Sequence, residues 1–512
     1  MNSTFFFEKG VVMKKQFDER NLTMVMDFYE LTMANGYFKD EDKERKVAFD
    51  VFYRKNPDNA GYAIFAGLEQ IIEYIENLHF DEDDIEYLRG QGLFGEEFLA
   101  YLADFKFRGD IYSFPEGTIM YPNEPILTVV APLIDAQIVE TAILLEVNHQ
   151  SLIATKARRI VRAAKGRAVS DFGARRAHNM DAAVYGARAA YIGGVSSTAT
   201  VLAGKMFGIP VSGTMAHSFV MFYDNEYDAF KQYALTYPEN TILLVDTYDV
   251  LKQGVPNAIR VAHEVLEPMG YRLKGIRLDS GDLAYLSKKC RVMLDEAGLF
   301  DCKIVISNSL DERIINSLIE QDAKIDILGV GERLITSRSE PVFGAVYKLC
   351  AKEENGAFIP KIKISENEEK ITNPGLKKLY RIYDEDNKAV ADLIAFADET
   401  ININNLKVID PKKPWKSYEF KNANLKELLV PIFKDGKLIY DLPNLNEIRD
   451  YVNYQLTNEI WPEEQRIENP HEHYLDMTEK YQPDLLILDL VMPNLDGIGV
   501  LERISSLNLS KQ

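Results

Sequence analysis

Four short runs in the middle of the chain decide the fold class: Ile242-Leu-Leu-Val-Asp246, Ile276-Arg-Leu-Asp279, Ile304-Val-Ile-Ser-Asn308 and Ile325-Asp-Ile-Leu-Gly329. Each is apolar, ends in small or polar residues, and is followed by a helical pattern. This rhythm is typical of parallel strands joined by crossover helices. The runs end about 20 to 35 positions apart, the length of one strand, one helix and two loops.

Two earlier runs, Val169–Phe172 and Ile209–Thr214, bring the number of such units to six. No glycine-rich dinucleotide fingerprint opens the series, and polar residues follow several different strands. We therefore predict an α/β protein with an irregular α/β barrel over residues 151–347, in preference to a doubly wound sheet. Its chemistry is expected at the carboxyl ends of the strands.

The flanking regions differ from the barrel. Residues 19–150 mix a helical run at 24–37, an alternating strand at 47–53 and a helix at 68–78, which predicts an N-terminal α+β domain. Residues 348–480 are lysine-rich, strand-poor and punctuated by prolines, so we expect a small C-terminal region that packs back on that domain. Residues 1–18 carry no periodic pattern and are expected to be a disordered leader.

The composition of the chain excludes several classes of function. The 512 residues are 46% apolar and carry a net charge of −20, which repels phosphate backbones and anionic lipid, so neither nucleic acid nor membrane is an expected partner. The longest nearly apolar stretch, residues 125–134, is too short to span a bilayer. Cys290, Cys302 and Cys350 lack the spacing of a zinc or redox motif, which indicates reduced thiols and a cytoplasmic protein.

One window departs from the acidic average. Residues 156–176 contain eight basic side chains and the single acid Asp171. Such a concentration favours a small polyanionic ligand, because arginine presents a planar fork of donors to phosphate. The alternative is a solvated helix face paired to acidic neighbours, which is equally plausible for residues 158–165. Arg175 and Arg176 follow a strand end, where ligands bind.

Two further strand ends carry candidate chemistry. Gly213-Thr-Met-Ala-His217 places a histidine after a glycine turn, which makes His217 the best candidate for a nucleophile or acid/base, although many single histidines are simply packed. Ile276-Arg277-Leu-Asp279-Ser-Gly-Asp282 ends a strand with a cation and two carboxylates. Arg277 suits a substrate carboxylate, and Asp279 suits developing positive charge or a divalent metal. An internal Arg277–Asp279 ion pair is the alternative, and both can hold.

The last predicted strand ends in Leu328-Gly329-Val-Gly331, whose unobstructed backbone amides suit a phosphate. Phosphate commonly lies on the final strand loops of barrels. Tyr29 and Phe172 are aromatic residues flanked by polar ones, and a flat aromatic substrate could stack on such rings.

In order, these motifs resemble the nicotinate phosphoribosyltransferase family from about residue 21 to 477. The likeness also rests on Met26-Asp-Phe-Tyr29-Glu-Leu-Thr-Met33, Gly61-Tyr-Ala-Ile-Phe-Ala-Gly67, Glu124-Pro125, Asn148 and Ala154-Thr-Lys-Ala157. It implies a barrel of the type II phosphoribosyltransferase kind. It also implies an ATP-dependent ligase and glycosyltransferase of NAD biosynthesis that converts nicotinate and 5-phosphoribosyl 1-diphosphate to nicotinate mononucleotide and diphosphate.

The resemblance also assigns roles. His217 would be phosphorylated by ATP, and Asp279 would lie near the ribose and Mg²⁺, whose ligands stay unassigned. Nicotinate would meet Tyr29, Phe172, Thr214 and Arg277, and the phosphoribosyl group would meet Arg175, Ser309, Gly329 and Gly331. A homodimer with shared active sites is expected, with Tyr29 reaching the neighbouring subunit's site. One departure is Glu332, where many relatives have threonine.

The final 32 residues, 481–512, are a separate matter. Pro483 to Gly497 resembles the phosphoacceptor strand of a response-regulator receiver domain, with Asp489 in the acceptor position. This length cannot complete a doubly wound domain, so we interpret it as an incomplete receiver-like tail. Two alternatives remain from the sequence: transfer to nicotinamide or quinolinate, or a phosphate-sensing signalling protein that uses Asp489.

Overall fold

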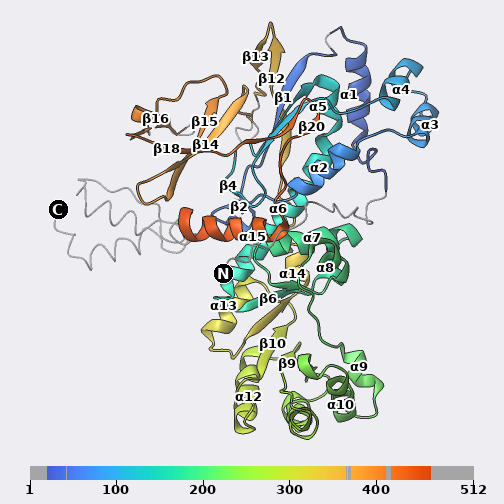
Figure 1. Cartoon of the computed structure of the whole chain (residues 1–512), viewed down its shortest axis with the longest axis vertical. Coiled ribbons are helices and arrows are strands. Elements are labelled where there is room, and N and C mark those ends of the chain that lie inside the picture. Colours follow the sequence, from blue (N-terminus) through green and yellow to red (C-terminus); the bar gives the residue numbers. More distant parts are fainter. Residues whose placement is uncertain are drawn as a thin grey trace, which may run out of the picture.

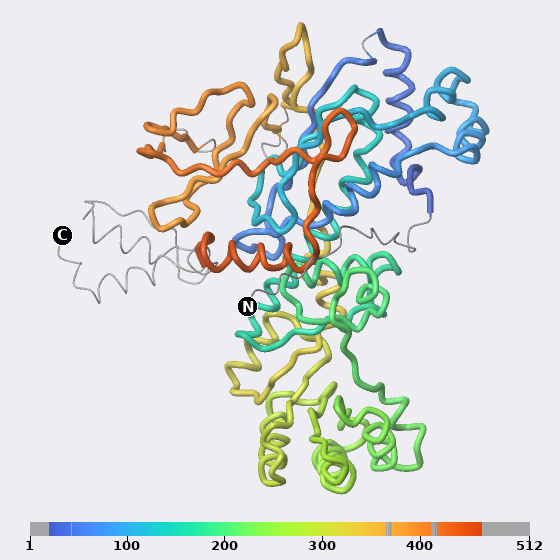
Figure 2. The backbone as a smooth tube through the Cα atoms, in the orientation of Figure 1, coloured from blue at the N-terminus to red at the C-terminus, as the bar shows by residue number. Residues whose placement is uncertain are grey.

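The computed structural model describes residues 20–41, 43–364, 366, 371–410, 415 and 417–462. The leader at 1–18 and the receiver-like tail at 481–512 lie outside these residues. An antiparallel sheet domain and a barrel lie end to end, and helix α15 (Leu445–Tyr454) crosses between them (Figures 1 and 2).

The barrel sheet has six parallel strands in the order β7-β6-β11-β10-β9-β8. The strands are β6 (Ala168–Asp171), β7 (Ser197–Thr198), β8 (Ile242–Leu244), β9 (Gly275–Leu278), β10 (Lys303–Ser307) and β11 (Ile327–Val330). Strand β11, the last of the six along the chain, pairs with β6, the first along the chain, with Val330 opposite Asp171. Because β8 to β11 follow one another in chain order and β11 returns to β6, the predicted irregular α/β barrel is confirmed.

The barrel is open at one seam. The predicted strand at 209–214 makes only one isolated bridge, from Val211 to Thr198, and among the described residues β8 pairs only with β9. Pro210 explains part of this, because proline has no amide hydrogen for a ladder. Its carbonyl still accepts a hydrogen bond from the amide of Thr198 at 3.0 Å.

Helices surround this sheet and present the residues that follow each strand. They are α7 (Met180–Ile192), α8 (Val201–Phe207), α9 (His217–Phe222), α10 (Glu226–Thr236), α11 (Val255–Val261), α12 (Leu283–Glu296), α13 (Glu312–Glu320) and α14 (Glu332–Ile335). Apolar side chains from strands and helices form one buried core. The site loops therefore rest on a packed scaffold.

The N-terminal domain is built on an antiparallel sheet in the order β13-β12-β1-β5-β3-β19-β20. Its strands are β1 (Lys46–Phe52), β3 (Asp110–Ser113), β5 (Leu127–Pro132), β12 (Val346–Glu354), β13 (Ala357–Pro360), β19 (Val430–Lys434) and β20 (Lys437–Leu438), beside the short pair β2 (Ala63–Ile64) and β4 (Ile119–Met120). Its helices are α1 (Phe28–Phe38), α2 (Leu68–Asn77), α3 (Glu82–Gly90), α4 (Glu96–Ala103) and α5 (Leu133–Ile138). Helix α2 buries Leu68, Ile71, Ile72 and Ile75, the spacing of one helical face.

Helix α6 (Glu140–Ala163) leads from this domain into the barrel. Further along the chain, Gln455 joins the C-terminal region to the N-terminal domain, because its side chain bonds the carbonyl of Gly117 and the amide of Ile119. No described helix is both long enough and apolar enough to cross a bilayer.

The expectation that the C-terminal region is strand-poor is wrong. It contains β14 (Lys377–Tyr383), β15 (Ala389–Phe396), β16 (Leu406–Ile409), β17 (Ser417–Phe420) and β18 (Asn424–Glu427), besides β19 and β20. Charged and polar residues interrupt several of these strands, as in Lys377-Lys-Leu-Tyr-Arg-Ile-Tyr383 of β14, so they lack the continuous apolar run that marks the barrel strands. The region does pack back on the N-terminal domain, because β19 pairs with β3, with Val430 opposite Ser113.

Candidate active site

Arg277 is the centre of a polar cluster at the carboxyl ends of the strands. Its guanidinium donates from Nε to Ser307 Oγ at 2.9 Å, from Nη1 to Thr214 Oγ1 at 3.1 Å and from Nη2 to Asp279 Oδ1 at 2.7 Å. The Phe172 ring lies beside it, with its centroid 5.4 Å from the guanidinium carbon. The internal Arg277–Asp279 ion pair therefore exists, and it belongs to a cluster that also contains candidate substrate contacts.

Two members of this cluster were missed by sequence reasoning. The hydroxyl of Ser307 also donates to Asp279 Oδ1, so it joins both charged groups. Asp246 Oδ2 accepts from the Asp279 amide at 2.9 Å and from Ser280 Oγ at 2.6 Å. The sequence did contain a signal for these two residues as possible site residues, because both lie at the ends of predicted strands next to β9.

His217 begins α9 at the edge of the same cluster. Its Nδ1 lies 3.1 Å from Thr247 Oγ1, and its Nε2 lies 3.9 Å from Asp279 Oδ2. The side chain is 39% exposed. If Nδ1 carries the proton and donates it to Thr247, then Nε2 is left as an accessible nucleophile.

The Phe172 ring packs directly on the last barrel strand. A Cβ on Gly329 would lie 2.6 Å from this ring, and one on Gly331 would lie 3.1 Å from the Phe172 carbonyl oxygen. The preceding Asp171 accepts from the Gly173 amide and from Thr198 Oγ1, both at 2.8 Å. Burial raises the pKa of Asp171. These contacts fix the turn that carries Phe172.

The proposed phosphate residues follow neighbouring strands. Ser309 comes just after β10 in a turn with positive φ of 53°, and Arg175 is an exposed residue of the short turn after β6. Gly329 lies within β11, and Gly331 comes between the end of β11 and the start of α14. Glu332, the departure from the family pattern, forms an ion pair with Arg338 at 3.0 Å, which partly offsets its charge beside this loop.

Part of the basic window is structural. Lys156 is 2% exposed and lies 3.0 Å from Asp58 Oδ2 and 2.8 Å from Glu312 Oε1. Arg159 also reaches Glu312, at 3.4 Å. For these two residues the alternative of pairing with acidic neighbours holds, and they are not free phosphate ligands.

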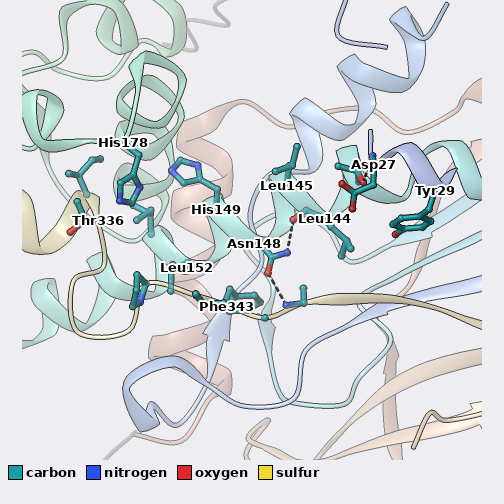
Figure 3. Close-up of a pocket in the computed structure, with 17 residues that line it drawn as sticks. Asp27, Tyr29, Leu144, Leu145, Asn148, His149, Leu152, His178, Thr336 and Phe343 are labelled. Atoms are coloured by element: carbon teal, nitrogen blue, oxygen red, sulfur yellow. Dashed lines mark hydrogen bonds between the residues drawn. The ribbon is translucent and has the colours of Figure 1, made fainter. Parts of the chain in front are cut away.

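Tyr29 lies outside the Arg277 cluster. It is on α1, in the sheet domain, and it lines a cavity of 510 Å³ that runs beside α6 (Figure 3). None of the other candidate site residues lines this cavity. Burial and the charge of Glu140 raise the pKa of Tyr29. A single chain therefore does not bring Tyr29 to the Arg277 cluster.

No group of three or more potential metal ligands occurs among the described residues. Asp279 Oδ2 makes no hydrogen bond to a described residue, and the buried Asp246 Oδ1 likewise has no such partner. Magnesium commonly uses one or two carboxylates together with substrate phosphates and water. These two carboxylates fit that kind of site.

A polar cluster at the carboxyl ends of parallel barrel strands defines the class of protein: an α/β-barrel enzyme. Comparison with known proteins then gives the family. Family models match the nicotinate phosphoribosyltransferase N-terminal domain at residues 24–148, the family itself at 167–368 and its C-terminal domain at 376–484.

A Bacillus subtilis nicotinate phosphoribosyltransferase is 48% identical over 465 residues, covering 90% of this chain and 94% of the relative. The solved structure of human nicotinic acid phosphoribosyltransferase aligns with a TM-score of 0.77 at 27% identity, covering 86% and 95% of the two chains. A nicotinate-nucleotide pyrophosphorylase from Pyrococcus furiosus aligns with a TM-score of 0.65 at 25% identity, covering 90% and 99%. The chain belongs to the nicotinate phosphoribosyltransferase family.

Proposed function

We propose that this chain forms nicotinate mononucleotide and diphosphate from nicotinate and 5-phosphoribosyl 1-diphosphate, with ATP hydrolysis, in NAD salvage. The observation that carries the proposal is the Arg277 cluster beside the Phe172 ring. The guanidinium provides charge and donors for the carboxylate of nicotinate, and the ring provides a surface for the pyridine.

The reaction needs no general base at the attacking atom. The pyridine nitrogen of nicotinate is unprotonated at neutral pH and is already nucleophilic. The barrier lies in positive charge at the ribose carbon and negative charge on the departing diphosphate. Asp279 would stabilise the first. Arg175, the Ser309 turn and the amides near Gly329 and Gly331 would bind the phosphates.

Mg²⁺ would be held by the substrate phosphates together with Asp279, and Asp246 is the second carboxylate available. Bound there, the ion would neutralise charge on the leaving diphosphate. Asp246 also positions Asp279, because it binds the backbone amide of that residue. Both tasks depend on the carboxylates being ionised.

His217 is the proposed phosphoryl acceptor. Its exposed Nε2 would attack the γ-phosphorus of ATP, ADP would leave, and the phosphohistidine would lie beside Asp279. Thr247 would hold the Nδ1 proton and so fix the reactive tautomer.

Two features of the assembly belong to the proposal. A homodimer with shared sites would bring Tyr29 of one subunit to the Arg277 cluster of the other, and the separation of α1 from the barrel strands within one chain supports this arrangement (Figure 1). The cytoplasm is the proposed location, and the three cysteines, all buried free thiols, support it.

Substitution of Arg277 tests the nicotinate assignment. Arg277→Gln should lower kcat/KM for nicotinate by roughly 10- to 100-fold, the range expected for losing a charge-assisted hydrogen bond. Arg277→Lys should restore only part of the loss, because lysine lacks the planar fork. Arg260→Gln, a change at an exposed arginine on α11, is the control. An unchanged kcat/KM for nicotinate in Arg277→Gln would remove Arg277 from substrate recognition.

A further inference from the structure

A second cavity of 510 Å³ lies at the opposite end of the barrel strands from the Arg277 cluster. Ala168 and Val169, which begin β6, line it, whereas Asp171 and Phe172 lead from the end of that strand to the candidate active site. Four arginines also line it: Arg158, Arg162, Arg167 and Arg449. We call this cavity the arginine pocket.

The charge of the pocket is unusual for this protein. Among the residues that the structure describes, no aspartate or glutamate lines the pocket, although the chain carries a net charge of −20. Arg158 and Arg162 lie one turn apart on α6, and like charges at this spacing destabilise a helix. A cation near a helix C-terminus is favourable and explains Arg162 and Arg167 in part. It does not explain Arg449, which comes from a different helix.

Three of the four guanidinium groups are held by neutral acceptors. Arg449 donates to the Gly194 carbonyl at 3.0 Å, and Arg167 donates to the Ile325 carbonyl at 3.0 Å. Arg158 reaches the amide oxygen of Asn453 at 3.5 Å. These contacts orient the side chains, and none of these three arginines forms an ion pair with a carboxylate of the described residues.

Arg158 adds an independent observation. Its Nε is buried and has no hydrogen-bond partner among the described residues. A buried donor without a partner is costly, so a ligand that accepts from it would gain that bond. Gly194 also lines the pocket next to this side chain, since a Cβ there would be in ordinary van der Waals contact with Arg158 Nη1 at 3.7 Å.

We propose that the arginine pocket binds a small phosphate-bearing anion at a site separate from the transferase site. Converging guanidinium groups match the oxygens of phosphate, and the volume lies in the range of small-ligand sites. Arg449 belongs to α15, whereas the other three arginines belong to the barrel and the helix that enters it. A bound anion would therefore join the C-terminal helix to the barrel and stabilise that junction.

Equilibrium dialysis of the full chain with labelled inorganic diphosphate tests the proposal. The binding curve should contain one class of sites that belongs to the arginine pocket. Arg158→Gln and Arg162→Gln should each weaken diphosphate binding to this class by roughly tenfold or more. Arg158→Lys should weaken it less than Arg158→Gln. Competition with inorganic phosphate and with AMP distinguishes an inorganic ligand from a nucleotide, and stronger competition by AMP would indicate a nucleotide.

The transferase site is expected to bind diphosphate too, through Arg175 after β6, so the dialysis is repeated in the Arg175→Gln variant. The arginine-pocket class should persist there, and Arg260→Gln should leave both classes unchanged. The unfolding temperature without ligand shows whether each variant is folded. Equal diphosphate binding by folded Arg158→Gln, folded Arg162→Gln and the unsubstituted chain would overturn the proposal, whatever the fate of the proposed function.

Discussion

At the scale of single residues, the Arg277 cluster shows what spacing predicts and what it does not. Arg277 lies on β9 and Asp279 follows the end of that strand, two positions later, so the sequence alone predicts that both lie on one face. Ser307 comes from the next strand of the sheet, and its contact with both depends on the register of β9 against β10. A pattern within one strand carries no information about that register, so the position of Ser307 at a strand end was visible but its contact with both charged groups was not.

The identity of the phosphoryl acceptor is also tested by changing single residues. Incubation with γ-labelled ATP should give a label that survives alkali, because phosphohistidine is stable in base whereas phosphoaspartate hydrolyses. His217→Ala should abolish this label, and Asp489→Ala should retain it. The reverse pattern would favour the signalling alternative suggested by the tail. The measurement is protein-bound radioactivity after alkaline treatment.

At the scale of elements, the contact between β11 and the turn after β6 is testable. A methyl group on Gly329 would lie 2.6 Å from the Phe172 ring, so Gly329→Ala must displace that ring or the strand. We expect the nicotinate KM to rise roughly tenfold, the effect of losing about 1.4 kcal/mol of binding.

Gly36→Ala is the matched control, because nothing lies within 4 Å of the added carbon and the site is within helix α1. It should leave the KM unchanged and stabilise the helix slightly. An unaltered nicotinate KM in Gly329→Ala would show that the position of Phe172 is unimportant for substrate binding.

Helix α1 also contains a group that links stability to pH. Burial raises the pKa of Glu30 to about 7, against an ordinary value of 4.5. The unfolded chain therefore loses this proton first, so the contribution of Glu30 to the free energy of unfolding is fully present below pH 4.5. It is lost as pH rises through about 7 and amounts to roughly 3 kcal/mol.

Chemical denaturation at a series of pH values measures this effect. Glu30→Gln should flatten the fall in stability between pH 4.5 and 7, whereas the exposed-site change Glu86→Gln should not. The same fall in both variants would assign the pH dependence to other groups. His149 acts in the opposite direction, because burial lowers its pKa to about 4, so protonation of the unfolded chain reduces stability as pH falls below 6.5.

At the scale of the whole molecule, the barrel was predictable from the rhythm of its strands, because buried parallel strands are continuous apolar runs. The seam at Val211 was not, because an apolar run before Gly213 looks the same whether or not it pairs. The strands of the C-terminal region were hidden because charged residues interrupt them, as Lys377, Lys378 and Arg381 do in β14. The return of β19 to the N-terminal sheet confirms the packing that was expected.

The position of Tyr29 gives a prediction about assembly. If Tyr29 serves the neighbouring subunit's site, Tyr29→Ala and His217→Ala will each be inactive alone, yet a mixture refolded together should regain about a quarter of the sites, since half the dimers are mixed and each has one intact site. Sedimentation should show a dimer. Activity that stays at the level of the separate variants would contradict shared sites.

The most direct measurement is formation of nicotinate mononucleotide from nicotinate, 5-phosphoribosyl 1-diphosphate and Mg²⁺, with and without ATP. Nicotinamide and quinolinate run in parallel as competing substrates. The structure and the proposed roles of Arg277 and His217 predict product from nicotinate alone and a rate raised by ATP. Product from nicotinamide or quinolinate instead, or no product from any of the three, would contradict the proposed function.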